Sequence, residues 1–398
     1  MRLRNAALAT FIACAPATAL AQQKQEPRRP VLIAGADTND AHAYYGFAIE
    51  RLTKEPQKAA DALYWATRLD PNWADAFYAR WVAMMLTDVT RYQLYSSGDR
   101  RTVAEVRAID SLLFRALTLN PFVPRRLERK LFDATLDAIA LRAARGQTSS
   151  GNVRFEMELA MQKWPPWRRA RFAHGDGQFE QALGLYSIAI EKDQKDFGLR
   201  LDRGRLLFEM GRFEGALLDL QSAMEDIKKQ QEKDLVFFYR SRAVTEHSIA
   251  VVHQKLGNTA AAKEAFGRAL EQDLAYYPAH LQLANIALDA KDTTAALAEL
   301  ALATQLRPDD AAAQFLHGFA LLRAGNASEG DAHLRKSIEL NPVYAAPKFL
   351  HARLLESADF REEAIDAYKA FLAAAARTDP TRVEAETRLA ALTRPPLS

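Results

Sequence analysis

Residues 259–269 read TAAAKEAFGRA, and residues 293–303, which lie 34 positions further along the chain, read TTAALAELALA. At this spacing a small residue recurs four times (Ala262, Ala296, Gly330 and Ala364). A large apolar residue follows each of them four positions later (Phe266, Leu300, Leu334 and Tyr368). Residues four apart share one helical face, so small and large side chains can interlock with a neighbouring helix. A period of 34 residues therefore predicts helix–turn–helix units that stack into a solenoid.

The segments between the helices repeat with the same spacing. Turns at residues 256–258, 290–292 and 324–326 lie 34 positions apart, and two of the three contain glycine followed by asparagine. Either residue can adopt the left-handed conformation that ends a helix, so we expect the first helix of each unit to stop there. Pro308 and Pro342 keep the same spacing and prevent an upstream helix from continuing. No run alternates polar and apolar residues as strands do, which predicts an all-α fold with almost no sheet.

These units resemble the tetratricopeptide repeat family, and the resemblance rests on three sets of positions. The small residue of the first helix is matched by Gly204, Ala284, Gly318 and Ala352. The alanine of the second helix is matched by Ala182, Ala216, Ala262, Ala296 and Ala364. The proline that closes a unit is matched by Pro71, Pro308 and Pro342. The resemblance implies a right-handed superhelical solenoid of about nine antiparallel helix pairs.

The repeat spacing divides the chain into six segments. We predict a signal peptide (1–21), a flexible leader (22–39), N-terminal repeats with an insertion (40–121), a degenerate helical pair (122–162), regular repeats (163–376) and a C-terminal capping helix with its tail (377–398). The insertion is expected near residues 87–102, because Pro71 and Pro121 are 50 residues apart instead of 34. A second insertion at residues 226–235 is expected to prolong a helix. The capping helix is expected because the last repeat would otherwise expose its apolar outer face.

The first 21 residues have the layout of a secretory signal peptide. Arg2 and Arg4 precede a short apolar run, and Ala19 and Ala21 are the small residues expected before a cleavage site. The run is too short to span a bilayer. Because it has the layout of a cleavable signal peptide, we expect an exported, periplasmic protein. Cleavage would remove Cys14, the only cysteine, and would lower the net charge from +3 to +1. The alternative is that Cys14 is lipidated and anchors the protein to a membrane.

The sequence contains no recognisable catalytic motif. It has no glycine-rich phosphate loop and no His-Glu-x-x-His zinc motif. His317 and His351 lie 34 positions apart, but both occupy packing positions of a first helix, and a metal site needs further ligands. We therefore expect no enzyme activity, no cofactor and no metal. The nearly neutral net charge also gives no reason to expect nucleic acid as a partner.

The first helices of tetratricopeptide repeats line a concave groove, so the resemblance also implies where a partner would bind. The corresponding positions hold Phe315, Phe319, Leu322, Phe349 and Arg353 in the last two full units, and Tyr44 and Tyr78 in the first two. Exposed apolar patches tend to mark binding sites. We therefore expect a scaffold that binds a peptide or protein of the cell envelope through apolar side chains. The alternative is that the capping helix or the curvature of the array buries these residues.

The family's clamp of lysine and asparagine residues for a terminal carboxylate is not recognisable. Its places are taken by Leu201, Leu281, Asn285, Phe315 and Phe319. The resemblance therefore does not imply binding of an acidic chain end at those positions.

A basic segment lies in the middle of the chain. Between Pro121 and Gly175 there are eleven Lys or Arg residues against five Asp or Glu, and the segment includes the run WPPWRR at residues 164–169. Such a segment could meet an acidic protein, anionic lipid or a polyanion. An alternative function is therefore a lipid or polyanion carrier that uses residues 122–171. The competing explanation is a solvated helix face whose tryptophans pack between repeats.

Overall fold

The computed structural model describes residues 26–94, 103–144, 160, 162–230 and 242–394. Within these ranges the regular structure consists of 18 α-helices and no strand, which confirms the all-α prediction. The helices are α1 (Ala41–Arg51), α2 (Pro56–Leu69), α3 (Ala74–Leu94), α4 (Val103–Leu119), α5 (Leu127–Ala144), α7 (Pro166–Gly175), α8 (Phe179–Lys192), α9 (Phe197–Glu209), α10 (Phe213–Gln230), α11 (Arg242–Lys255), α12 (Thr259–Gln272), α13 (Tyr277–Asp289), α14 (Thr293–Leu306), α15 (Ala311–Arg323), α16 (Ala327–Leu340), α17 (Ala345–Ser357), α18 (Arg361–Ala374) and α19 (Arg382–Thr393).

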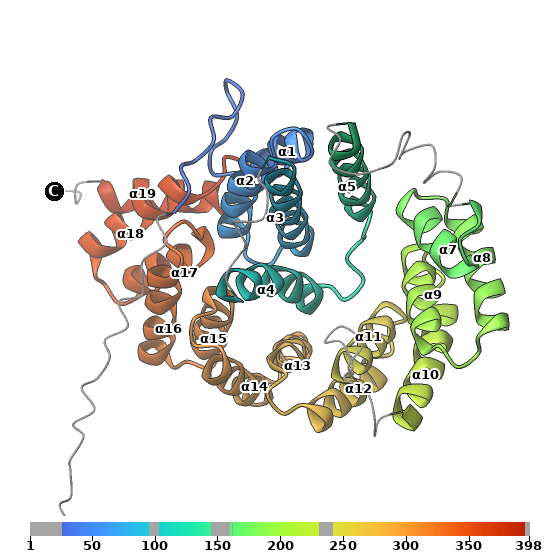
Figure 1. Ribbon diagram of the computed structural model, residues 1–398. Helices are drawn as coiled ribbons and strands as arrows, with labels where there is room; N and C mark the ends of the chain where they lie inside the picture. The colour runs from blue at the N-terminus through green and yellow to red at the C-terminus, as the bar shows by residue number, and fades with distance from the viewer. Residues whose placement is uncertain (1–25, 95–102, 145–159, 161, 231–241, 395–398) are drawn as a thin grey trace, which may run out of the picture.

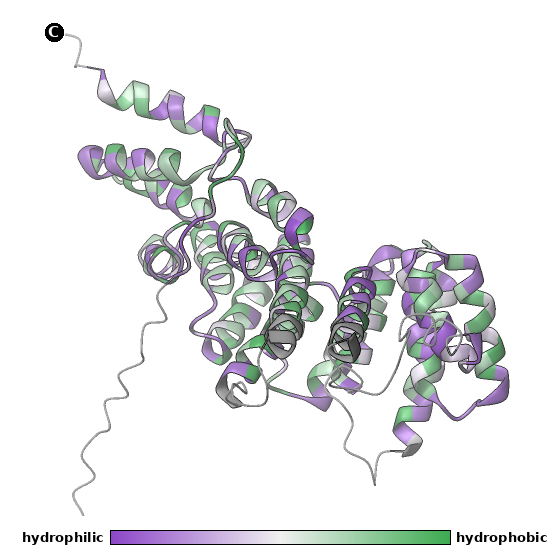
Figure 2. Cartoon of the chain, turned by 45° about the horizontal axis from the view of Figure 1, so that its top comes forward, coloured by the Kyte–Doolittle hydropathy of each residue, from purple (hydrophilic) through white to green (hydrophobic). Residues whose placement is uncertain are grey.

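Consecutive helices pack as pairs, and each pair stacks on the next, as a solenoid requires (Figure 1). The small and large residues that recur every 34 positions, which we call the 34-residue comb, lie in the contacts within the pairs. Ala262, Phe266, Ala296 and Leu300 are all fully buried. Hydrophobic and hydrophilic residues are interspersed along the helices in Figure 2, so each helix can bury one side and expose the other. None of the described helices combines the length and the apolar character needed to cross a bilayer.

The small residues of the comb allow close contact between helices. At Gly318 of α15, an added Cβ would lie only 2.9 Å from the carbonyl oxygen of Gly330 in α16. The comb has glycine at 330 for the same reason, since a Cβ there would meet Leu322 at 2.8 Å. The predicted turns are also confirmed, because Gly257 and Gly325 have positive φ angles of 75° and 83° after α11 and α15.

The two ends of the array contact each other, so the chain follows a closed, ring-like curve with α4 in its interior (Figure 1). Arg68 of α2 donates from Nη1 to the carbonyl oxygen of Leu340 at 3.0 Å. Asn341 returns a hydrogen bond from Nδ2 to the carbonyl oxygen of Arg68 at 2.7 Å. Asn39 donates to the carbonyl oxygen of Ala373 at 2.8 Å. The resemblance suggested an open groove along the last repeats, but the N-terminal repeats cover part of it.

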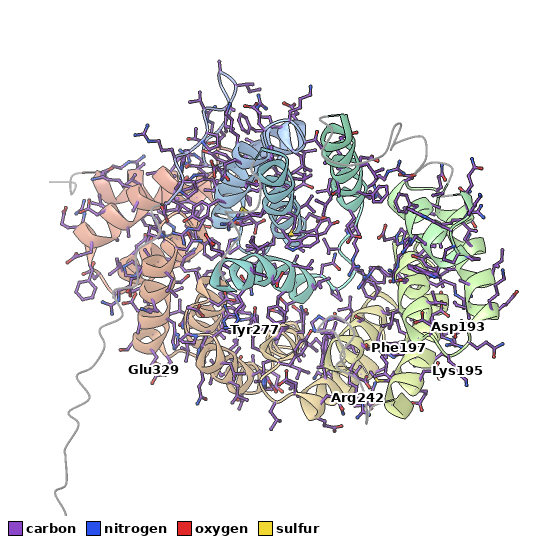
Figure 3. The ribbon with its side chains drawn as sticks, viewed as in Figure 1. Asp193, Lys195, Phe197, Arg242, Tyr277 and Glu329 are labelled. Carbon is purple, nitrogen blue, oxygen red and sulfur yellow. The ribbon has the colours of Figure 1, made fainter. Side chains whose placement is uncertain are left out.

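Arg115 of α4 makes the most buried of these contacts. Its Nη1 donates to Asp310 Oδ2 at 2.6 Å and to Tyr277 Oη at 2.8 Å, and its Nη2 donates to the carbonyl oxygen of Pro71 at 3.2 Å. Figure 3 shows the labelled Tyr277 next to α4. Burial alone would lower the pKa of Arg115, but Asp310 and Tyr277 raise it above its ordinary value. The side chains of Arg115 and Asp310 are only 14% and 8% exposed, so the pair is largely removed from solvent.

Several predicted segment boundaries can be compared with the helices. The insertion near residues 87–102 begins within α3, which continues to Leu94, and residues 95–102 lie outside the described part. α10 runs to Gln230, so the described part of the second insertion does prolong a helix. α5 is the first helix of the degenerate pair, and α19 occupies the position of the predicted cap. The predicted signal peptide, with Cys14, lies outside the described residues.

His247 of α11 should make the stability of the fold depend on pH. It is fully buried, and neither ring nitrogen has a hydrogen-bond partner among the described residues. Burial lowers its pKa to about 3, whereas an unfolded histidine has a pKa of about 6.5. The neutral ring therefore favours the folded state above pH 6.5, and this contribution is lost as the pH falls from about 6.5 toward 3, by about 1.4 kcal/mol per pH unit. Denaturant unfolding should show a steeper loss of stability in this range for the natural protein than for His247→Leu. Equal slopes would contradict the account.

Candidate functional site

An arginine-lined pocket lies between α5, α7 and α9, on the side formed by the first helices of the pairs. Its volume is about 320 Å³, which is in the range of sites for small ligands or single side chains. Five of its lining residues are arginines: Arg125, Arg126, Arg129, Arg171 and Arg205. The remainder comprise two carboxylates, Glu128 and Asp202, with Phe132, Phe172, His174, Gly175, Tyr186 and Leu201. We call this site the arginine pocket.

The basic WPPWRR run begins α7, whose residues Arg171 and Phe172 line the arginine pocket. Pro165 and Pro166 begin α7, where the missing N–H of a proline does no harm. Trp164 packs edge-on against Phe172, with ring centroids 5.0 Å apart, and against Phe132 of α5 at 6.1 Å. The aromatic cluster therefore connects α5 to α7. This arrangement agrees with the alternative in which the tryptophans of the basic segment pack between repeats.

Two of the five arginines in the arginine pocket are hydrogen-bonded to carboxylates. Arg171 donates from Nε to Asp202 Oδ2 at 2.8 Å, and the nearest contact of the pair is 2.6 Å. Arg129 donates from Nε to Asp133 at 3.1 Å and from Nη1 to Asp176 at 2.8 Å. These pairs neutralise two of the five guanidinium charges and fix their orientation.

Like Arg126, Arg205 forms no ion pair among the residues that the structure describes. Its Nε is buried and has no hydrogen-bond partner there, and the same holds for the Nε of Arg125. The Nε of Arg125 is 3.6 Å from Glu128, too far for a hydrogen bond. Burial, and to a smaller extent the positive charge of Arg125, lower the pKa of Arg205 to about 10. Arg205 therefore remains positively charged at neutral pH. The pocket thus contains a buried cation whose bonding capacity is incompletely used.

A second, larger cavity continues from the arginine pocket. It has a volume of about 530 Å³ and shares Arg129 and Phe172 with the pocket. Its other walls include Trp164, Arg169 and Leu185. Its lining also contains Asp176 and three glutamines. Two neighbouring cavities of this kind provide room for more than one side chain of a bound segment.

The predicted phenylalanine groove lies elsewhere, where α4 meets α13 and α15. A cavity of about 180 Å³ there is lined by Phe315 together with Leu281, Asn285 and Arg115. Phe315 packs edge-on against Tyr344, with ring centroids 5.5 Å apart. Phe315, Phe319 and Leu322 are half-buried, so their role as partner contacts stays a prediction.

Three of the predicted partner-binding residues are buried instead. Tyr44 is 0%, Tyr78 is 1% and Phe349 is 8% exposed. Phe349 packs against Phe371 of α18, with centroids 5.2 Å apart, so the packing alternative fits these residues better than partner contact. Tyr44 and Tyr78 belong to a hydrophobic cluster of the N-terminal helices, and Phe349 belongs to a cluster formed by α17, α18 and α19.

Arg353 is also engaged within the chain. It donates from Nη1 to Glu384 Oε1 of the capping helix α19 at 2.5 Å. Both side chains are more than 40% exposed, at 43% and 42%, so the pair is weak and a partner could compete for it.

The two histidines that share the 34-residue spacing do not meet each other. His317 bonds through Nδ1 to Thr304 at 3.1 Å and lies beside the ring of His333. His351 bonds through Nδ1 to Asp331 at 2.5 Å. Within the ranges that the structure covers, no cluster of three or more His, Cys, Asp or Glu side chains could hold a metal ion.

Arg205 and Asp202 were missed by the sequence analysis, although a signal for the arginines was present. Arg171 and Arg205 lie 34 positions apart, and each follows a buried small residue of a first helix, Ala170 or Gly204. Arg205 therefore occupies the position in its repeat that Phe319 occupies after Gly318. A comparison of the residue after the small residue of each first helix would have shown that arginine occupies this place at both 171 and 205.

The fold and the site define the class of this protein: an all-α array of stacked helix pairs with its pocket on the first helices. Residues 247–276, which span α11, the turn and α12, match the sequence profile of the tetratricopeptide repeat. The match lies at the stretch where the residues that recur every 34 positions begin.

Comparisons with individual proteins give distant similarities. BBSome complex member bbs-4 of Caenorhabditis elegans is 22% identical over 202 residues, which are 50% of this chain and 43% of that protein. The chain therefore matches less than half the length of this relative. The C-terminal part of a TPR repeat-containing protein from Cytophaga hutchinsonii superposes with a TM-score of 0.44 at 14% identity, covering 52% of this chain and 78% of that structure. YrrB, described as a TPR protein with an unusual peptide-binding site, gives a TM-score of 0.37 at 18% identity, covering 52% and 99%.

Proposed function

We propose that this protein is an exported, non-enzymatic scaffold that holds a peptide or protein partner on the inner face of its helical array. The observation that carries the proposal is the arginine pocket with its adjoining cavity, built on the first helices of successive pairs. Helical repeat arrays present long surfaces of this kind to partners. The tetratricopeptide repeat at residues 247–276 supports the same role.

The alternative function, a carrier of lipid or polyanion on residues 122–171, receives less support. Arg129 and Arg171 of this segment are paired with carboxylates. Arg168 is stacked 4.9 Å above the ring of Trp164 and 5.2 Å from that of Trp167. A polyanion would need several free cations in a row, whereas these arginines are largely engaged within the chain.

Site-specific photo-crosslinking in the cells that produce the protein tests the scaffold proposal. A photoreactive residue at Leu201, in the wall of the arginine pocket, should form a defined protein adduct. The matched control is Leu218 of α10, which is 68% exposed on a second helix and should give no such adduct. No protein adduct at Leu201, or the same adducts at both positions, would contradict the proposal.

The exported location is part of the proposal and has its own test. Intact mass measurement of the protein from its native cells should show a chain that begins at Gln22 and lacks Cys14. A chain that begins at a lipid-modified Cys14 would support membrane anchoring instead. A chain that retains residues 1–21 would contradict export by this signal.

A further inference from the structure

We infer, on the basis of the scaffold function proposed above, that the arginine pocket binds one carboxylate side chain from an acidic segment of the partner, with Arg205 as its main contact. Nothing in the 34-residue comb or in the similar proteins assigns a ligand to this pocket. The inference follows from the geometry and the charge of the pocket's own residues.

The first step is the count of charges. Five guanidinium groups line the pocket together with two carboxylates, Glu128 and Asp202. Two further carboxylates, Asp133 and Asp176, bind Arg129 from beside it. Glu209 also lies beside the pocket, bound to the lining residue His174 at 3.1 Å. The lining residues themselves carry five positive charges against two negative ones, an excess that these neighbouring carboxylates reduce. The pocket therefore favours an anionic group of low charge, such as a single carboxylate.

The second step is the unused bonding capacity. The Nε atoms of Arg205 and Arg125 are both buried without a hydrogen-bond partner among the described residues. A buried polar group without a partner is unfavourable, and charge-assisted bonds to a carboxylate are among the strongest that a guanidinium can make. Because each guanidinium carries five N–H donors in a fixed plane, each can grip a carboxylate through two of them. Because the Nε of Arg205 is enclosed, a ligand carboxylate would bind the guanidinium through its Nη groups.

The third step is the shape of the site. The volume of about 320 Å³ accommodates one acidic side chain, and Phe132, Phe172 and Tyr186 provide apolar walls for its methylene groups. The adjoining cavity of about 530 Å³, with Trp164 and Leu185, can receive a neighbouring apolar side chain. The fitting ligand is therefore an acidic residue close to an apolar or aromatic residue. Low dielectric around the buried Arg205 strengthens the attraction.

The test is a binding titration of the full-length protein with a fluorescent peptide that contains several Glu residues next to a Phe, with the matched Gln-for-Glu peptide as the ligand control. The Glu peptide should bind, and added salt should weaken it. Arg205→Gln should reduce its affinity about tenfold or more, as expected for loss of a charge-assisted bidentate contact. The control variant Arg212→Gln, whose exposed side chain pairs with Glu180, should leave the affinity unchanged.

A second variant keeps the inference testable if Arg205→Gln folds poorly. Asp202→Asn removes the carboxylate that binds Arg171, makes the net charge of the pocket more positive by one and should strengthen binding of the Glu peptide. Equal binding of the Glu and Gln peptides, or no change with either variant, would overturn the inference. Binding of inorganic phosphate or anionic phospholipid vesicles in preference to the Glu peptide would overturn it as well.

The two proposals fail in different ways. If Leu201 crosslinks to a protein partner but Arg205→Gln and Asp202→Asn leave that adduct unchanged, the scaffold function stands and the carboxylate site is wrong. If no partner crosslinks at Leu201, the scaffold proposal itself is contradicted, whatever the peptide does.

Discussion

Replacement of Arg115 by Ala should lower the free energy of unfolding by about 3–5 kcal/mol, because it leaves the carboxylate of Asp310 without its cationic partner in a largely buried contact. The change also removes the hydrogen bonds to Tyr277 and to the carbonyl oxygen of Pro71. Since the contacts with Asp310 and Tyr277 join residues 195 and 162 apart in sequence, their loss should separate the N-terminal repeats from the C-terminal ones. Denaturant unfolding measures the first effect, and small-angle scattering should show an increased radius of gyration.

Two comparisons make the Arg115 prediction specific. Asp310→Asn removes the charge but keeps a side chain that can cap α15, where Asp310 accepts hydrogen bonds from Ala312 and Ala313. A double-mutant cycle of the two positions should therefore show strong coupling. Arg353→Ala breaks an exposed pair and should change stability by about 1 kcal/mol at most. If Arg115→Ala is no more damaging than Arg353→Ala and leaves the scattering curve unchanged, the closed arrangement is wrong.

Replacement of Phe266 by Ala should destabilise the protein by about 3–5 kcal/mol, because the ring is fully buried between α11 and α12 and its removal leaves a cavity. The ring packs edge-on against His247, with centroids 5.2 Å apart, and its loss would also loosen that buried imidazole. Hydrogen exchange should show faster opening of α11, α12 and the neighbouring pairs, since repeats stabilise one another through their shared interfaces.

The matched control for Phe266 is Phe360, which is 54% exposed before α18. Phe360→Ala should change the free energy of unfolding by about 0.5 kcal/mol or less. If the two variants lowered the free energy of unfolding by similar amounts, the 34-residue comb would not mark the core.

The regular part of the fold could be predicted from the sequence because its determinants are local. Ala262 and Phe266 repeat at 34 residues, and the same physical requirement, a small residue facing a large one, operates in every unit. Gly330 departs from alanine because its helix approaches the backbone of Gly318 closely. The turn at Gly257 followed from the left-handed conformation that ends a helix.

Closure of the array could not be predicted in the same way. Arg115 and Asp310 belong to no repeating pattern, and their contact depends on small rotations that add up over many helix pairs. The groove positions were transferred from the family pattern, so Tyr44 and Tyr78 were interpreted as partner contacts, although packing among the N-terminal helices buries them.

The site was predictable only in part. The basic segment was identified by its composition, and its residues Arg129 and Arg171 do line the arginine pocket. The sequence could not show which charges would be neutralised, since Asp202 and Asp176 come from later repeats and reach the arginines only after folding. Arg205 combines the lack of such a partner with a buried Nε that has no hydrogen bond among the described residues, and only the three-dimensional arrangement reveals that.

The central claim is that the inner face of α5, α7 and α9 holds a protein partner. Hydrogen–deuterium exchange of the full-length protein, alone and with the purified partner identified by crosslinking at Leu201, tests it most directly. The account predicts that the partner slows exchange in α7, α9 and residues 121–132, with little change in the second helices α8 and α10. Protection confined to α8 and α10, or no protection near the arginine pocket, would contradict it.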